Sequence, residues 1–127
     1  MWTEAKVPDT ERILRDLLDE WKAGVDRHDP GRVADVFTDD AIFQGLHPYS
    51  VGHQGVRDYY ASQPVGLTVE YTFHEVRRPA DDVALGYLRA NFTRPDGVGI
   101  PLNLGVVATR RDGRWRIGFY QVSAVPD

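Results

Sequence analysis

The second half of the chain is a series of four long segments in which apolar and polar residues alternate. They cover residues 67–76, 82–93, 99–110 and 113–125. A period of two is typical of β-strands that bury one face. The turn sequences at 95–97 and 111–113, Pro-Asp-Gly and Arg-Asp-Gly, separate the last three segments. Turns this short join antiparallel neighbours. The pattern therefore predicts a long antiparallel sheet, and the first half of the chain has to cover one face of it.

That first half has helical periodicity instead. From Asp9 to about His28, apolar residues recur at intervals of three and four, and either Asp9 or Thr10 is suited to cap the helix. A second, short helix is expected after Asp29, which would cap it, with Pro30 at its first position. The inward residues of these two helices are Ile13, Leu14, Leu17, Leu18, Trp21, Val25, Val33, Val36 and Phe37.

Asp39 and Asp40 are expected to end the second helix. Neighbouring aspartates could also suggest a metal site, but adjacent side chains point apart and turns favour aspartate, so the structural role is preferred and no metal is predicted. A short strand at 41–43 follows. The stretch 53–62 is then predicted to form a third helix that buries Val56 and one or both of the tyrosines that follow, Tyr59 and Tyr60.

Composition narrows the class of protein. A chain of 127 residues fits a single domain, 1–127, with one core. It has no cysteine, a start without the pattern of a secretion signal and no long apolar run, so we expect a cytoplasmic protein that does not contact membranes. The net charge of −4, without a basic stripe, argues against a nucleic-acid partner.

Helices followed by a long sheet indicate an α+β domain with three N-terminal helices packed on a curved antiparallel sheet. A strongly twisted sheet that curls around helices leaves a conical cavity, which is where a small molecule would lie.

The stretches at 17–43, 52–60 and 110–123 together resemble the nuclear-transport-factor-two-like superfamily, in its SnoaL-like and ketosteroid-isomerase-like branch. The ending "DGRWRI" with the later "FYQ" is similar to a group found in natural-product biosynthetic clusters. The resemblance implies a cone-shaped, cystatin-like fold and a homodimer. It specifies function poorly, because this fold hosts isomerases, cyclases, dehydratases, epoxide hydrolases and binding domains.

The resemblance also implies where isomerase residues would lie. The aspartate base of those enzymes would fall at or beside Gly45, next to Gln44, and neither residue can abstract a proton. The helix tyrosine corresponds to Trp21, whose indole N–H can only donate. The protonated acid would fall within 103–106, where the chain has no carboxylate. Any activity must therefore use other residues.

The loop "IFQGLHPYSVGH" supplies the remaining candidates for chemistry. It places His47, Tyr49 and His53 where the loop of this fold crosses the mouth of the cavity. Histidine is the usual general acid or base near neutral pH, so His47 is the predicted catalytic residue. The alternative is a set of partly exposed loop side chains, and His53 is equally suited to cap the third helix.

Strand alternation predicts further residues of the pocket. On the last strand it puts Trp115, Phe119 and Gln121 on one face, which by resemblance points into the cone. On the second long strand, Arg89 shares a face with Asn91. Arg89 and Glu75 could form an ion pair inside the cone, or both charges could lie in water at the ends of their strands. The predicted ligand-binding residues are Trp21, Phe37, Tyr49, Tyr59, Phe73, Arg89, Asn91, Trp115, Phe119 and Gln121.

On the same alternation, Leu88, Phe92, Tyr120 and Val122 would lie on the opposite face of the sheet. An exposed apolar face favours a homodimer through the sheet, or burial of a sheet edge by another partner.

Three functions are compatible with these features. The first is a cofactor-free cyclase, isomerase or dehydratase of a polyketide-type intermediate that uses His47 to bind and convert a small hydrophobic or polycyclic molecule. The second is a non-catalytic ligand-binding or accessory protein of a biosynthetic pathway, which the missing isomerase carboxylates favour. The third is a protein-interaction module with a collapsed pocket.

Overall fold

The computed structural model describes residues 7–126 as three helices and six strands. Residues 1–6, on which the expectation of no secretion signal partly rests, and Asp127 lie outside the described residues. The helices are α1 (Val7–Asp26), α2 (Pro30–Ala34) and α3 (His53–Ala61). The strands are β1 (Phe37–Gln44), β2 (Ser50–Val51), β3 (Thr68–Ala80), β4 (Val83–Thr93), β5 (Gly99–Arg111) and β6 (Arg114–Ala124).

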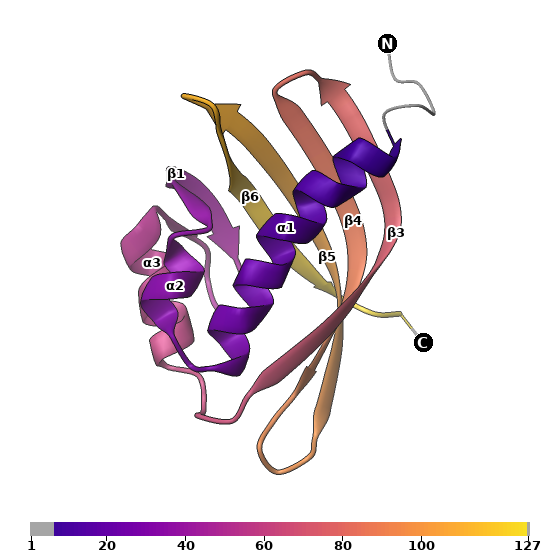
Figure 1. The fold of residues 1–127 in the computed structure, drawn as a ribbon. Coiled ribbons are helices and arrows are strands. Elements are labelled where there is room, and N and C mark those ends of the chain that lie inside the picture. The colour runs from indigo at the N-terminus through magenta and orange to yellow at the C-terminus, as the bar shows by residue number, and fades with distance from the viewer. Residues whose placement is uncertain (1–6, 127) are drawn as a thin grey trace.

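All six strands belong to one curved sheet in the order β2-β1-β6-β5-β4-β3. The prediction that the four strands from β3 to β6 pair antiparallel, each with the next, is confirmed. The sheet is not antiparallel throughout, however, because β1 pairs with β6 in parallel. Most of the chain lies between these two strands, and a long connection is what a parallel pair requires. Helix α1 crosses the concave face, while α2 and α3 lie beside β1 (Figure 1).

Helix α1 supplies much of the cover for the sheet. Its apolar stripe buries Leu14, Leu18 and Trp21 completely, and the Trp21 ring meets Phe92 of β4 edge-on at 5.9 Å. The helix begins at Val7, so Asp9 lies in its first turn rather than at its cap. A carboxylate in that turn still interacts favourably with the positive end of the helix dipole.

The cap of the second helix is confirmed, but its end is not where we expected it. The Asp29 carboxylate accepts a hydrogen bond from the backbone N–H of Arg32 at 3.2 Å. The helix ends at Ala34, and Asp39 and Asp40 lie within β1 instead of ending the helix. The N–H of Ile117 donates to the carbonyl of Val36 at 2.8 Å, which draws the chain into the sheet directly after α2.

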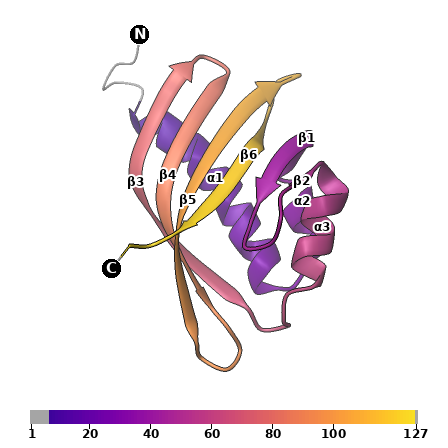
Figure 2. The ribbon, with the colours of Figure 1, turned by 180° about the vertical axis from the view of Figure 1, so that it is seen from behind.

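The two faces of the sheet follow from its register. One face, here called the inner face, is covered by α1 and carries buried rows such as Gly86–Val106–Tyr120 and Leu88–Leu104–Val122. The opposite face, here called the outer face, carries the rows Leu85–Val107–Phe119, Tyr87–Gly105–Gln121 and Arg89–Asn103–Ser123. Figure 2 shows the sheet from behind, with α1 beyond it.

A β-bulge at Gly118 overturns the predicted alternation of the last strand. Ile117 pairs with Ala108 and Phe119 with Val107, so Gly118 is an extra residue. An extra residue reverses the alternation beyond it. Trp115 therefore faces inward as expected, as does Ile117, whereas Phe119 and Gln121 face outward. The residues expected on the opposite face, Leu88, Phe92, Tyr120 and Val122, are buried on the inner face.

Within residues 7–126, no helix combines the length and the apolar character that crossing a membrane requires.

Candidate functional site

Aromatic side chains fill most of the inside of the cone. Phe43 of β1 stacks on Tyr120 of β6 with ring centroids 4.5 Å apart. Phe37 and Trp21 each approach the same tyrosine from other sides, at 5.8 and 6.0 Å. All four rings are buried. The wide cavity expected from the sequence is therefore largely occupied by the protein's own side chains.

A small cavity of about 30 Å³ remains near the mouth of the cone, and here it is called the cone cavity. It has room for about one water molecule or one carbonyl group. Its walls are apolar apart from one amide and three tyrosines. The lining residues are Leu46, Tyr59, Tyr60, Gln63, Leu67, Phe92, Ile100, Leu102, Tyr120 and Val122.

Three buried polar groups form a chain that ends at this cavity. The indole N–H of Trp21 donates to the hydroxyl of Tyr60 at 3.0 Å. The Tyr60 hydroxyl lies 3.2 Å from the hydroxyl of Tyr120. One of these two hydroxyls donates to the other, so one O–H proton of the pair has no acceptor among the described residues. Because both tyrosines line the cone cavity, that proton is available to a molecule that enters it.

Burial fixes the protonation state of this pair. Removal from water raises the pKa of Tyr60 well above its ordinary value, although the hydrogen bonds with Tyr120 and from Trp21 act in the opposite direction. Burial also raises the pKa of Tyr120, and the neighbouring Tyr60 adds to that shift. Both hydroxyls are therefore neutral hydrogen-bond donors at physiological pH. They cannot act as bases, but they can polarise a carbonyl oxygen.

Gly45, at or beside which the family resemblance would place an isomerase base, has no room for a side chain. Gly45 is buried, and a Cβ atom built on it would lie 2.5 Å from the ring of Tyr59. Tyr59 thus occupies the space that an acidic side chain would need. Its hydroxyl also accepts a hydrogen bond from the N–H of Leu46 at 3.2 Å, which ties the loop to α3.

The three loop candidates do not converge on the cone cavity. His47 is exposed, and its ring packs edge-on against Tyr59 at 5.6 Å. Tyr49 is 66% exposed. His53 is the first residue of α3, and its Nε2 lies 2.7 Å from the carbonyl of Phe37 on β1. The ring therefore fastens α3 to β1 rather than capping the helix, whose cap position is Gly52.

The remaining predicted residues are dispersed over both faces. Of the ligand-binding residues predicted from the sequence, only Tyr59 lines the cone cavity directly, and Trp21 reaches it through Tyr60. Phe73 and Trp115 face inward, but neither lines the cavity. The guanidinium groups of Arg78 and Arg110 lie over the Trp115 ring, 5.2 and 5.3 Å from its centroid.

The inward orientation predicted for four other residues is wrong. Phe119 and Gln121 face outward because of the Gly118 bulge. Arg89 and Asn91 face outward because their neighbours Leu88, Ala90 and Phe92 are the buried ones. No Arg89–Glu75 pair forms inside the cone, since Glu75 is exposed and pairs with Arg77 at 3.1 Å.

Most of the residues that do line the cavity were not among those predicted from the sequence. Tyr120 was placed on the other face, and the isolated glycine at 118 is the one signal for the bulge that turns it inward. Tyr60 was expected to be buried, but its partners come from distant parts of the chain. No group of three or more metal-ligating side chains capable of holding an ion occurs in the described part of the chain.

The fold and the cavity define a class of protein, the cystatin-like cones. A domain of unknown function with this fold from Nostoc punctiforme is 16% identical, with a TM-score of 0.82 over 98% of this chain and 80% of that one. An NTF2-like protein of unknown function from Pseudomonas putida is 19% identical, with a TM-score of 0.79 over 94% and 89% of the two chains. A ketosteroid isomerase-like protein from Erwinia carotovora is 22% identical, with a TM-score of 0.73 over 91% and 96%.

The sequence profile of the SnoaL-like domain matches residues 18–117. The chain therefore belongs to the SnoaL-like family of the nuclear-transport-factor-two-like superfamily, as the sequence resemblance indicated. No curated protein matches the chain significantly.

Proposed function

We propose that this protein binds a small, mainly apolar molecule at the mouth of the cone and hydrogen-bonds its carbonyl oxygen, without converting it. The observation that carries the proposal is the O–H proton of the Tyr60–Tyr120 pair that has no acceptor among the described residues and faces the cone cavity. A neutral donor among apolar walls is what recognition of one oxygen in a hydrophobic ligand requires. The protein would then act as a binding or accessory component of a biosynthetic pathway, in the cytoplasm.

The size of the cavity limits how the ligand lies. About 30 Å³ accepts a carbonyl group but not a ring system. The apolar body therefore has to rest at the mouth, where Leu46 is 57% exposed and Ile100 half-buried. A polycyclic ligand would enter further only if the loop that carries Leu46 moved away from Tyr59.

A naphthyl ketone fluorophore, compared with the corresponding hydrocarbon, tests this proposal. We expect the ketone to bind more tightly. Either single variant, Tyr60→Phe or Tyr120→Phe, keeps one hydroxyl to donate, whereas the double variant loses both. The double variant should weaken ketone binding about five- to tenfold and leave hydrocarbon binding unchanged, since a lost hydrogen bond is worth about 1 kcal/mol. Tyr71→Phe is the matched control because its hydroxyl bonds Asp19 outside the cavity. Equal binding of ketone and hydrocarbon would contradict the proposal.

Catalysis is the second candidate, in the form of a cofactor-free cyclase, isomerase or dehydratase. The contact of the His47 ring with Tyr59 favours it, because Tyr59 lines the cavity. A histidine at this place can carry a proton to a ligand at the mouth. A β,γ-unsaturated cyclic ketone, followed by absorbance as it becomes conjugated, tests this candidate. Turnover that His47→Ala abolishes would establish it and displace the non-catalytic proposal.

A homodimer through the outer face belongs to the same proposal. Ile42 and Tyr87 are more than 40% exposed on that face, and Leu85, Val107 and Phe119 are half-buried around a hollow of about 190 Å³ over Gly105. Contiguous apolar area of this kind is typical of an interface. The sequence predicts Leu88, Phe92, Tyr120 and Val122 for the exposed face of the sheet. Other residues lie there in the structure, but the proposed interface is still the outer face of the sheet.

A further inference from the structure

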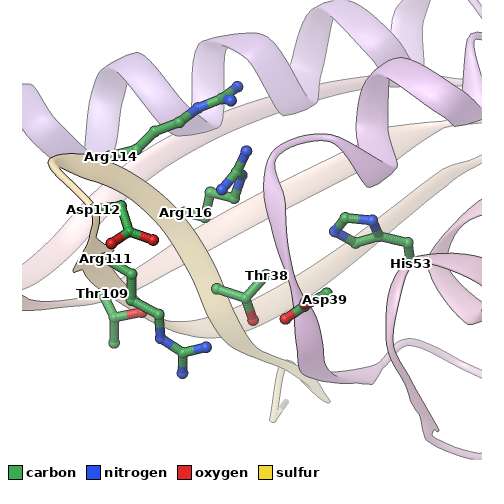
Figure 3. Close-up of a pocket in the computed structure, with 8 residues that line it drawn as sticks. All are labelled: Thr38, Asp39, His53, Thr109, Arg111, Asp112, Arg114 and Arg116. Carbon is green, nitrogen blue, oxygen red and sulfur yellow. The ribbon is translucent and has the colours of Figure 1, made fainter.

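A second, much larger hollow lies outside the cone, where β1 departs from β6. It has a volume of about 530 Å³, and we name it the arginine cleft. The sheet register explains it: β1 advances from Phe37 to Ile42 while β6 advances only from Ile117 to Phe119. The start of β1 therefore bends away from its neighbour. The cleft is lined by Thr38, Asp39, His53, Thr109, Arg111, Asp112, Arg114 and Arg116 (Figure 3).

Two of the three arginines in the cleft have no anionic partner among the described residues. Arg111 pairs with Asp40 at 3.2 Å, and the hydrogen bond from Thr38 together with Arg111 lowers the pKa of that carboxyl. The side chains of Arg114 and Arg116 make neither an ion pair nor a hydrogen bond with any residue in the described range 7–126. Their positive charges are therefore available to a ligand.

Unpaired donors are also buried at the base of the cleft. Arg116 and Thr109 are paired across β6 and β5. The Nε of Arg116 and the Oγ1 of Thr109 are both buried and have no hydrogen-bond partner among the described residues. A buried donor without a partner costs about 1–3 kcal/mol, and more when it is charged. Of the three such side-chain atoms in the described part of the chain, two belong to residues that line the arginine cleft, which points to a ligand bound beside them.

The opposite wall offers acceptors. Asp39 extends from β1, whereas Asp112, in the turn between β5 and β6, lies on the same side as the arginines. Figure 3 shows Arg114 and Arg116 on one strand, with Asp39 and His53 across the cleft. Because a carbonyl can only accept, the His53 Nε2 that faces the Phe37 carbonyl carries a proton, so Nδ1 is the ring nitrogen that can accept. The arginine donors therefore lie on one side of the cleft, and the acceptors Asp39 and His53 lie on the other.

We infer that the arginine cleft binds the phosphate monoester of a small polyhydroxylated molecule. The phosphoryl group lies against Arg114, Arg116 and Thr109, and the hydroxyl groups face Asp39. A phosphoryl group has three terminal oxygens for these three donor residues, whereas a carboxylate has two. The volume of the cleft exceeds that of a phosphate ion and leaves room for the organic part.

Isothermal titration calorimetry at constant ionic strength tests this inference, with glycerol phosphate, inorganic phosphate, glycerol and succinate as probes. We expect glycerol phosphate to bind at least threefold more tightly than inorganic phosphate and at least tenfold more tightly than glycerol or succinate. Arg116→Gln should weaken glycerol phosphate binding about tenfold, as expected when a charge-assisted hydrogen-bond donor is lost. Arg94→Gln is the matched control, since Arg94 is exposed and pairs with Asp96 in the β4–β5 turn.

Two further variants test the inference independently of Arg116→Gln. Thr109→Val keeps the shape of the side chain and should weaken glycerol phosphate about threefold or more, even if Arg116→Gln does not fold. Asp39→Asn should bring the affinities for glycerol phosphate and inorganic phosphate closer together. The inference is overturned if glycerol phosphate does not bind, if succinate binds more tightly, or if the Arg116 and Thr109 variants bind it as the Arg94 control does. The Tyr60→Phe/Tyr120→Phe double variant should bind glycerol phosphate normally, which separates this site from the cone cavity.

Discussion

The hydroxyl groups of Tyr60 and Tyr120 lie 3.2 Å apart inside the cone, and the indole of Trp21 donates to the first of them. These three residues come from α3, β6 and α1. Their polar groups lie among aromatic rings of the described core. Their hydrogen bonds underlie the predicted effects of substitutions on the free energy of unfolding, and the proposed hydrogen bond to a ligand carbonyl.

The two tyrosines should contribute unequally to stability. Tyr120→Phe removes one hydrogen bond but leaves the number of unpaired donors unchanged. Tyr60→Phe also leaves the buried Trp21 N–H without an acceptor. We expect a loss of about 0.5–1.5 kcal/mol for Tyr120→Phe and about 1–3 kcal/mol for Tyr60→Phe, measured by urea unfolding. An equal or reversed order would show that the indole finds another acceptor.

Stability should fall at alkaline pH. Burial raises the folded-state pKa of Tyr60 and Tyr120, so the folded state holds protons that the unfolded state releases above its ordinary tyrosine pKa of 10.0. Their contribution is fully present below pH 10.0 and is lost as the pH rises towards the folded-state values. The slope is about 1.4 kcal/mol per pH unit for each retained proton. Urea unfolding between about pH 8 and pH 11 should show a shallower decline for Tyr120→Phe than for the wild type.

Gly45 should not tolerate a side chain while Tyr59 is present. Its backbone does not have a positive φ, so the obstacle is the Tyr59 ring, which would lie 2.5 Å from the Cβ atom of any residue placed here. We expect Gly45→Ala to cost about 1–3 kcal/mol in the free energy of unfolding, as overpacking does. In a Tyr59→Ala background the same substitution should cost much less. A cost that is the same in both backgrounds would rule out this contact as the cause.

The outer face should control the oligomeric state. Tyr87→Lys places a charge in the middle of the apolar surface and should convert a dimer to a monomer in analytical ultracentrifugation. Val65→Lys is the control, because Val65 is 74% exposed in the α3–β3 connection, away from the sheet face. A wild-type protein that is monomeric at all concentrations, or a Tyr87 variant that stays dimeric, would contradict the proposed interface.

Much of the fold could be predicted because its signals are local. The stripe of α1, the Asp29–Pro30 start of α2 and the turn sequences each act within a few residues. The burial of Val56 and Tyr60 on α3 is confirmed for the same reason. The end of α2 was misplaced because the hydrogen bond from Ile117 to Val36, between residues far apart in the chain, decides it.

The candidate site could not be predicted in the same way. One extra residue at Gly118 reverses the facing of all later residues in β6, so that Gln121 lies outside the cone and Tyr120 inside it. The arginine cleft was missed because its walls join the start of β1 to the β5–β6 turn. Charged residues beside a turn are usually solvated, and nothing in the sequence shows that Arg116 and Thr109 share a cleft with Thr38.

The class of fold can be read from the residues alone, because periodicity and turn chemistry are properties of short stretches of chain, and the resemblance of such stretches indicated the SnoaL-like family. The folded chain adds that aromatic rings fill the cone, that two tyrosine hydroxyls meet there, and that unpaired donors gather in a second cleft. These features depend on strand register and on contacts between residues tens of positions apart, where a shift of one residue exchanges the inside of the molecule for its surface.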